Sequence, residues 1–215
     1  MGPDADATAR TLGIGEGTMK LLSRTSREVR PWKNACGVSE DILVSPTVDA
    51  SGHPYWRVAL ATVDSDVPFS RFEGMERILM PISRDGMELA IDGEFTRVPR
   101  YSVLAFPGEA AVAAHNVRVP SQDINVMIDR NAGSATLTRR YVVGSTPIRK
   151  AAEKEVAVIV ALAPTLRRNG NPLLIGDAIL LDERDGGYLT GFGNTALVRI
   201  TLKDGPFSLG TCREM

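Results

Sequence analysis

Apolar and polar residues alternate, or apolar residues run on uninterrupted, in short segments that recur from Leu21 to the C-terminus. Gly, Pro, Asp and Asn separate these segments, as they separate the strands of sandwiches and barrels. The clearest candidate strands are 55–63, 77–82, 87–91, 102–106, 111–119, 124–128, 156–163, 178–182 and 197–202. A spacing typical of a helix is sustained almost nowhere, and the best candidate for a short helix runs from Pro147 to Glu155. The pattern as a whole predicts an all-β protein.

The same pattern suggests how the chain is divided. Residues 1–18 are polar and acidic, so we expect a disordered tail, with Met19 a candidate for the true start of translation. We place a first barrel at 19–145 and a second, barrel-like half at 146–215. A chain of 215 residues can bury the cores of both. No long polar linker joins the halves, so we expect them to pack closely.

Charge and cysteine content narrow the range of partners. Lys and Arg total 25 against 26 Asp and Glu, so no long-range field would attract nucleic acid or an anionic membrane surface. No segment is long and apolar enough to span a bilayer, and the first residues lack the features of a secretory signal. Cys36 and Cys212 cannot form a disulfide framework, which is typical of a reducing compartment. We therefore expect a cytoplasmic protein.

Two of the candidate strands carry polar groups on one face. In the segment 55–63, alternation places Trp56, Val58 and Leu60 on one face and Arg57, Ala59 and Ala61 on the other. If the face of small residues lines a barrel interior, it leaves room for a ligand, and the guanidinium of Arg57 could hold a carboxylate. The alternative is that Arg57 lies on a solvated face.

The segment 122–130 alternates more sharply. Its apolar face carries Ile124, Val126 and Ile128, and its other face carries Asp123, Asn125, Met127 and Asp129. A solvated outer face would also alternate, but Asp and Asn are poor strand formers. Their presence in a short strand indicates that their side chains serve a specific purpose.

Several motifs together resemble the HutD/Ves family. They are the loop from Pro31 to Ile42, the strand from Tyr55 to Ala61, the segment from Phe69 to Leu79, Phe106-Pro107-Gly108, and Asp123-Ile124-Asn125-Val126-Met127. The resemblance covers about half of the chain. It implies a bicupin of the RmlC-like cupin superfamily, with two fused jelly-roll barrels, and a role in histidine utilisation through binding of a pathway intermediate. The second half carries no diagnostic motif of its own.

The resemblance also implies a ligand-binding site in the first barrel. The residues that it assigns are Trp32, Lys33, Asn34, Gly37, Ser39, Asp41, Trp56, Arg57, Arg77, Asp123, Asn125 and Met127. The chain departs from the family pattern at Ala35 and Cys36, which replace glycines, at Asp41, which replaces Glu, and at Ala59, which often is Ser. These changes are closer to the Ves side of the family, which is described as stress-associated. They leave the identity of the ligand open.

Residues suited to metal-dependent chemistry are scarce. Cupins that bind a metal present a His-x-His pair with further His and Glu ligands, but this chain has only His53 and His115. We therefore expect no metal and no cofactor. A metal-independent isomerase or hydrolase could use His115 with Asp123 or Glu109 as general acid and base.

The function that we predict is binding of a small carboxylate metabolite without metal, in a regulatory or stress-related role. Arg57 would pair with the carboxylate, Asn34 and Asn125 would form hydrogen bonds, and Lys33 or Arg77 would add positive charge. Trp32 and Trp56 would wall the site. The alternatives are the isomerase or hydrolase and a protein-interaction module, and homodimerisation is possible through sheet edges.

Overall fold

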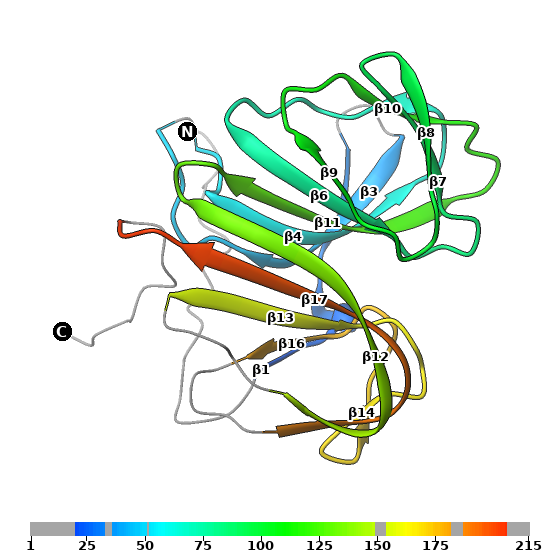
Figure 1. Ribbon diagram of the computed structural model, residues 1–215, viewed down its shortest axis with the longest axis vertical. Helices are drawn as coiled ribbons and strands as arrows, with labels where there is room; N and C mark the ends of the chain where they lie inside the picture. The colour runs from blue at the N-terminus through cyan, green and yellow to red at the C-terminus, as the bar shows by residue number, and fades with distance from the viewer. Residues whose placement is uncertain (1–19, 33–35, 51, 149–153, 182–186, 206–215) are drawn as a thin grey trace, which may run out of the picture.

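The computed structural model describes residues 20–32, 36–50, 52–148, 154–181 and 187–205. These residues form antiparallel strands and one 3-10 turn, η1 (Arg24–Ser26). The strands lie in two curled halves, one above the other in Figure 1. The prediction of an all-β protein is confirmed. In the part of the chain described here, no helix has the length and apolar character needed to cross a membrane.

The first half consists of two sheets, and the second half is built on one. A six-stranded sheet contains, in order, β2 (Val29–Pro31), β3 (Gly37–Val44), β4 (Trp56–Val63), β11 (Ser121–Asp129), β6 (Met75–Pro81) and β9 (Leu104–Pro107). A four-stranded sheet contains β5 (Val67–Pro68), β10 (Val112–His115), β7 (Met87–Ile91) and β8 (Glu94–Val98). The third sheet contains β1 (Lys20–Leu22), β16 (Ala178–Leu181), β13 (Glu155–Ala161), β17 (Gly187–Leu202), β14 (Arg167–Arg168) and β15 (Asn171–Pro172), and β12 (Gly133–Ile148) also pairs with β17.

The apolar residues form three layers. One layer fills the first half between its two sheets and includes Leu79, Leu89 and Phe106. A second fills the interior of the second half. The third and largest lies between the halves, where one face of β4, β6 and β11 packs against one face of β13 and β17. Strands at the centre of the molecule are therefore buried on both faces, which is why β13 has the nearly continuous apolar sequence Glu-Val-Ala-Val-Ile-Val-Ala.

The layer between the halves explains the bulky face of β4. Trp56, Val58 and Leu60 are 0%, 0% and 1% exposed and pack against the second half. Burying one large apolar side chain stabilises a fold by about 1.5–3 kcal/mol. The opposite face of β4, with Arg57, Ala59 and Ala61, therefore looks into the first half, the first of the two alternatives that the sequence left open.

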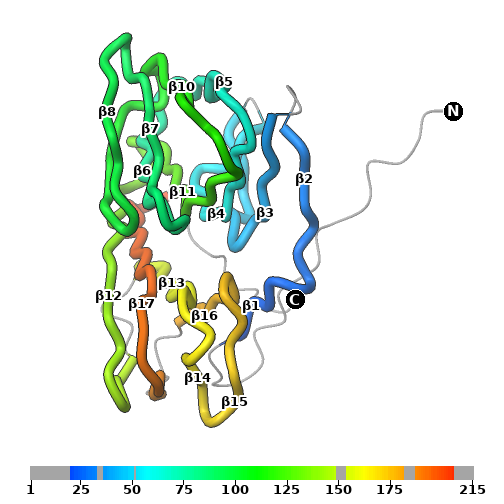
Figure 2. Tube along the Cα trace, turned by 90° about the vertical axis from the view of Figure 1, so that its right-hand side faces the viewer, coloured from blue at the N-terminus to red at the C-terminus, as the bar shows by residue number. Residues whose placement is uncertain are grey.

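Strand pairing does not follow the division that we predict at residue 145. Both β1 and nearly all of β12 lie in the range 19–145, yet they pair with β16 and β17 of the second half. Figure 2 shows the N-terminal segment running from β1, beside the second half, to β2, beside the first. The N-terminal segment thus ties the two halves together, and the boundary between two domains stays a prediction.

The strand candidates are confirmed, with shifted ends, whereas the helix candidate has both of its ends in strands. Pro147 and Ile148 end β12, and Glu155 begins β13; residues 149–153 lie outside the described residues. The long strands β12 and β17 were largely missed, since exposed polar residues and glycines interrupt their apolar pattern. The predicted tail and Met19 also lie outside the described residues.

A candidate ligand site inside the first barrel

The pairing of β4 with β11 places polar side chains beside two alanines. Ala61 lies opposite Asp123, and Ala59 lies opposite Asn125. Ala59 and Ala61 lie two and four residues after Arg57 on β4, so they share its face, and residues directly opposite each other on paired strands also share a face. All four residues therefore look into the first half. Because alanine ends at Cβ, the two polar side chains have no bulky neighbour on the β4 side.

The strands on either side of this pair add further polar groups. On β3, Ser39 lies opposite Ala61 and Asp41 opposite Ala59. On β6, Arg77 lies opposite Met127 of β11, which in turn lies opposite Arg57 of β4. The pairing thus brings the predicted residues of four strands to one interior face.

Arg57 is held by an acidic neighbour. Its Nε donates a hydrogen bond to Oδ1 of Asp41, and Nη1 of Arg30 lies 3.6 Å from the other carboxylate oxygen, Oδ2. The side chains of Arg57 and Asp41 are 27% and 24% exposed, so the pair lies at the rim of the barrel interior. Within the described chain, the guanidinium of Arg57 makes no other hydrogen bond, and its terminal nitrogens remain free to donate. Asp41 therefore orients Arg57 and partly neutralises it.

Arg77 is the most deeply buried cation of the site. It is 6% exposed, and its guanidinium carbon lies 5.3, 5.8 and 5.2 Å from the ring centres of Phe69, Phe72 and Phe106. Burial lowers its pKa to about 10, so it remains charged at neutral pH. Its Nη1 donates to the carbonyl oxygen of Ser70 at 3.2 Å, whereas its buried Nε has no partner among the described residues.

Two buried acceptors lie on β11. Oδ1 of Asp123 and Oδ1 of Asn125 are buried and accept no hydrogen bond from any described residue. Asp123 is 2% exposed, and burial raises its pKa to about 7, although the charge of Arg77 acts in the opposite direction. At neutral pH, Asp123 is therefore close to half protonated and can act as either donor or acceptor.

Trp32 closes one side of the cluster. Its Nε1 donates to Oγ of Ser39 at 2.8 Å, and its ring meets that of Phe69 edge to face at 5.8 Å. A Cβ added to Gly37 would lie 2.7 Å from the carbonyl oxygen of Thr62 and 3.0 Å from the ring of Trp32. Gly37 is thus required for the indole to lie against β3.

Not all predicted residues belong to this cluster. Trp56 packs in the layer between the halves, on the opposite face of β4, so the prediction that it walls the site is wrong. Lys33 and Asn34 lie outside the described residues. Cys36 is partly buried against the apolar layer of the first half.

His115 lies outside the cluster, whereas the ring of His53 meets that of Phe72 edge to face at 6.3 Å. His115 faces away from the barrel interior with 49% of its side chain exposed, and its Nδ1 lies 3.6 Å from Oδ2 of Asp66. Glu109, one of its two predicted carboxylate partners, instead accepts hydrogen bonds from Arg130 and from the backbone N–H of Gly74. The acid–base arrangement that we considered for His115 is therefore not assembled.

Sequence reasoning missed the three phenylalanines around Arg77. Phe69 and Phe72 belong to one of the segments that resemble the HutD/Ves family, and Phe106 begins another, but none of the three was assigned to the site. The spacing Phe-x-x-Phe followed five residues later by Arg77 was the available signal. An arginine in an apolar strand commonly stacks on aromatic rings, so nearby aromatic residues could have been assigned to it.

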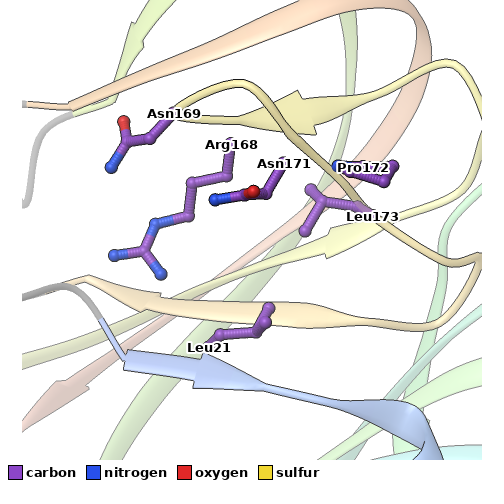
Figure 3. A pocket seen from close by; sticks show the side chains of 6 residues that line it. All are labelled: Leu21, Arg168, Asn169, Asn171, Pro172 and Leu173. Atoms are coloured by element: carbon purple, nitrogen blue, oxygen red, sulfur yellow. The ribbon is translucent and has the colours of Figure 1, made fainter.

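A separate surface pocket lies on the second half. It is lined by Leu21, Arg168, Asn169, Asn171, Pro172 and Leu173, which belong to β1 and to the β14–β15 hairpin (Figure 3). None of these residues belongs to the cluster in the first half. In the described ranges, no three His, Cys, Asp or Glu side chains converge as a possible metal site.

Comparisons of sequence with known proteins point to one family. The HutD family model matches residues 24–197. An uncharacterised 21.2 kDa protein in the hutC 3′ region of Pseudomonas putida is 30% identical over 173 residues, covering 74% of this chain and 90% of the relative. Protein Ves of Escherichia fergusonii is 29% identical over 119 residues, covering 54% and 61%.

Solved structures share the fold. HutD from Pseudomonas fluorescens SBW25, in a formate condition, has a TM-score of 0.73 at 23% identity and covers 86% of this chain and 100% of its own. A cupin 2 conserved barrel domain protein from Leptotrichia buccalis has a TM-score of 0.50 at 13% identity, covering 78% and 89%. The predicted cupin architecture of two fused barrels is thereby confirmed.

Proposed function

The chain belongs to the HutD family, and from this premise we propose that it binds a small carboxylate metabolite inside its first barrel, without a metal. The observation that carries the proposal is the set of three buried polar atoms that have no hydrogen-bond partner among the described residues: Nε of Arg77, Oδ1 of Asp123 and Oδ1 of Asn125. Leaving a buried polar atom unpaired costs about 1–3 kcal/mol. Native proteins keep such atoms mainly where a ligand, an ion or an ordered water completes them.

The charges favour an anionic ligand. Arg57 and Arg77 both face the interior, and Asp41 balances only the first of them. A carboxylate accepts two hydrogen bonds in the plane of a guanidinium, so it matches the free nitrogens of either arginine. Asp123 does not oppose this, because in its protonated form it donates a hydrogen bond to a carboxylate.

The relatives suggest which carboxylates to test. The Pseudomonas putida relative is encoded in the 3′ region of hutC, and HutD of Pseudomonas fluorescens was solved in a formate condition. Formate and the intermediates of histidine degradation are therefore the first candidates. A regulatory or stress-related role, in which the bound metabolite reports the state of a pathway in the cytoplasm, is part of this proposal.

The test is a thermal-shift and calorimetric screen of the ligand-free protein. Formate, histidine, urocanate, formylglutamate and glutamate would be titrated with and without divalent metals. A ligand that binds only the native state raises the melting temperature in proportion to ln(1 + [L]/Kd). We expect at least one carboxylate to stabilise the protein equally well in both series.

A pair of variants localises the binding. Asn125→Ala removes one of the buried acceptors and should weaken the affinity about 10-fold, the value of a buried hydrogen bond. Asn131→Ala, on the exposed turn after β11, is the matched control and should bind as the wild type does. No stabilisation by any carboxylate, stabilisation only with metal, or equal affinity of the two variants would refute the proposal.

A further inference from the structure

A second pocket lies at the seam between the two halves. We call it the seam pocket; its volume is about 240 Å³, and Arg84, Arg100, Tyr101 and Gln122 line it from the first half, and Leu162 and Ile175 from the second. A water molecule in the liquid occupies about 30 Å³, so the pocket could hold a molecule of several heavy atoms. It shares no lining residue with the cluster inside the first barrel.

The arginines of the seam pocket lack acidic partners. Arg84 is exposed and makes no hydrogen bond or ion pair with any described residue. Nε of Arg100 donates to the carbonyl oxygen of Ile82 at 2.9 Å, which leaves its terminal nitrogens without a protein partner in the described chain. Among the described residues, no Asp or Glu lines the pocket. Elsewhere in the described ranges five arginines pair with carboxylates, as Arg24 pairs with Glu40.

The side chains of two arginines stack on the ring of Tyr101. The guanidinium carbons of Arg100 and Arg139 lie 4.4 and 5.2 Å from the centre of its ring. The backbone of Tyr101 has a φ of 65°, a left-handed conformation that is unfavourable for an aromatic residue. Its N–H donates to the carbonyl oxygen of Pro81 at 2.8 Å, which fixes the conformation. The structure thus keeps a strained residue where it stacks two cations at the pocket.

We propose that the seam pocket binds a second ligand, a small oxyanion of the phosphate or carboxylate class, between Arg84 and Arg100. Two cations in a described lining that contains no Asp or Glu create a positive potential although the net charge of the chain is −1. Guanidinium groups are well matched to planar or tetrahedral oxyanions. The apolar side chains of Leu162 and Ile175 form the opposite wall, so the anion contacts both halves.

This proposal is independent of the site in the first barrel, and it predicts an effect across the seam. An anion that touches both halves perturbs residues of both, whereas an ion held loosely by one arginine perturbs only its own surroundings. The probe is inorganic phosphate, titrated into ¹⁵N-labelled protein at constant ionic strength. We expect saturable shifts of the Arg84 and Arg100 side-chain signals and of the Tyr101 and Ile175 amides. A parallel titration with acetate tells which class of oxyanion is preferred.

Variants make the test specific. Arg84→Gln alone, which removes a guanidinium that makes no hydrogen bond or ion pair with any described residue, should weaken phosphate binding several-fold, and Arg84→Gln with Arg100→Gln should abolish the saturable shifts. Arg97→Gln, on an exposed position of β8, is the matched control and should respond as the wild type does. Asn125→Ala, which tests the first-barrel site, should also leave the phosphate response unchanged.

Two results would overturn the proposal. One is a response to both phosphate and acetate that stays linear with concentration, which marks non-specific screening. The other is a saturable response that persists in the double variant. If the double variant loses the phosphate response but still binds the carboxylate of the first barrel, the two sites are distinct.

Discussion

Asp123 should make the stability of the protein fall as pH rises through the weakly acidic range. Its carboxyl group is 2% exposed, and burial raises its pKa from 3.8 to about 7. An acid with a raised pKa in the native state binds its proton more tightly there than in the unfolded chain. The native state is therefore favoured below pH 4, and this advantage is lost progressively until about pH 7.

The magnitude follows from the size of the shift. One pKa unit corresponds to about 1.4 kcal/mol, so the change from 3.8 to about 7 corresponds to roughly 4 kcal/mol of stability. Asp123→Asn keeps the shape of the side chain but cannot ionise. The wild type should be about as stable as this variant near pH 4, and should fall behind it by up to roughly 4 kcal/mol near pH 8.

The assay is urea denaturation of ligand-free protein at half-unit steps from pH 4 to pH 8. The difference between the wild type and Asp123→Asn is the informative quantity, because titration of all other groups cancels in it. Asp85→Asn, on the exposed turn before β7, controls for removal of a carboxylate that water solvates. Parallel stability curves for the wild type and Asp123→Asn would show that Asp123 is not desolvated as the structure indicates.

Two further predictions concern how the halves are held and how β7 begins. Glu40 is 6% exposed and accepts hydrogen bonds from Nη2 and Nε of Arg24 at 2.7 and 3.0 Å. Glu40→Gln should therefore lower the free energy of unfolding, measured by urea denaturation, by about 2 kcal/mol. The control Glu28→Gln, at an exposed ion pair, should lower it by less than about 0.5 kcal/mol. A Cβ on Gly86, whose φ is 72°, would lie 2.3 Å from a carbonyl oxygen of β8, whereas a Cβ on Gly93, at φ 91°, would meet nothing within 4 Å. Gly86→Ala should therefore lower the free energy of unfolding by at least about 3 kcal/mol, and Gly93→Ala by about 1 kcal/mol. Equal losses in the two variants would contradict the close approach of Gly86 to the backbone of β8.

The sequence was most informative where a strand has two different faces. The alternation correctly separated Arg57 from the bulky face of β4, and Asp123 and Asn125 from the apolar face of β11, because side-chain period depends only on the strand itself; that both polar faces look into the first half follows from the structure. It could not show that Arg57 is held by Asp41. That contact depends on the pairing of β3 with β4, which shifts between Asp41 and Leu43.

The sequence was least informative where neighbours decide the structure. In β12, exposed polar residues and a glycine at φ 68° interrupt the apolar pattern by which a strand is predicted. The segment is nevertheless a strand because it pairs along its whole length with β17. The burial of Trp56 between the halves depends on the packing of two sheets. The seam pocket is formed by turns far apart along the chain, so neither Arg84 nor Arg100 stood out in the sequence.

The central claim, that a carboxylate binds among Arg77, Asp123 and Asn125, is tested most directly by a crystal structure of the protein soaked in 5-bromo-2-furoate, a carboxylate whose bromine is on an aromatic ring and does not alkylate side chains. Bromine scatters anomalously, so its position can be located without relying on the protein phases. The account predicts a bromine peak inside the first barrel, with the carboxylate in contact with Arg77 or Arg57. A bromine peak confined to other surfaces, with ordered waters completing the three unpartnered atoms, would contradict it.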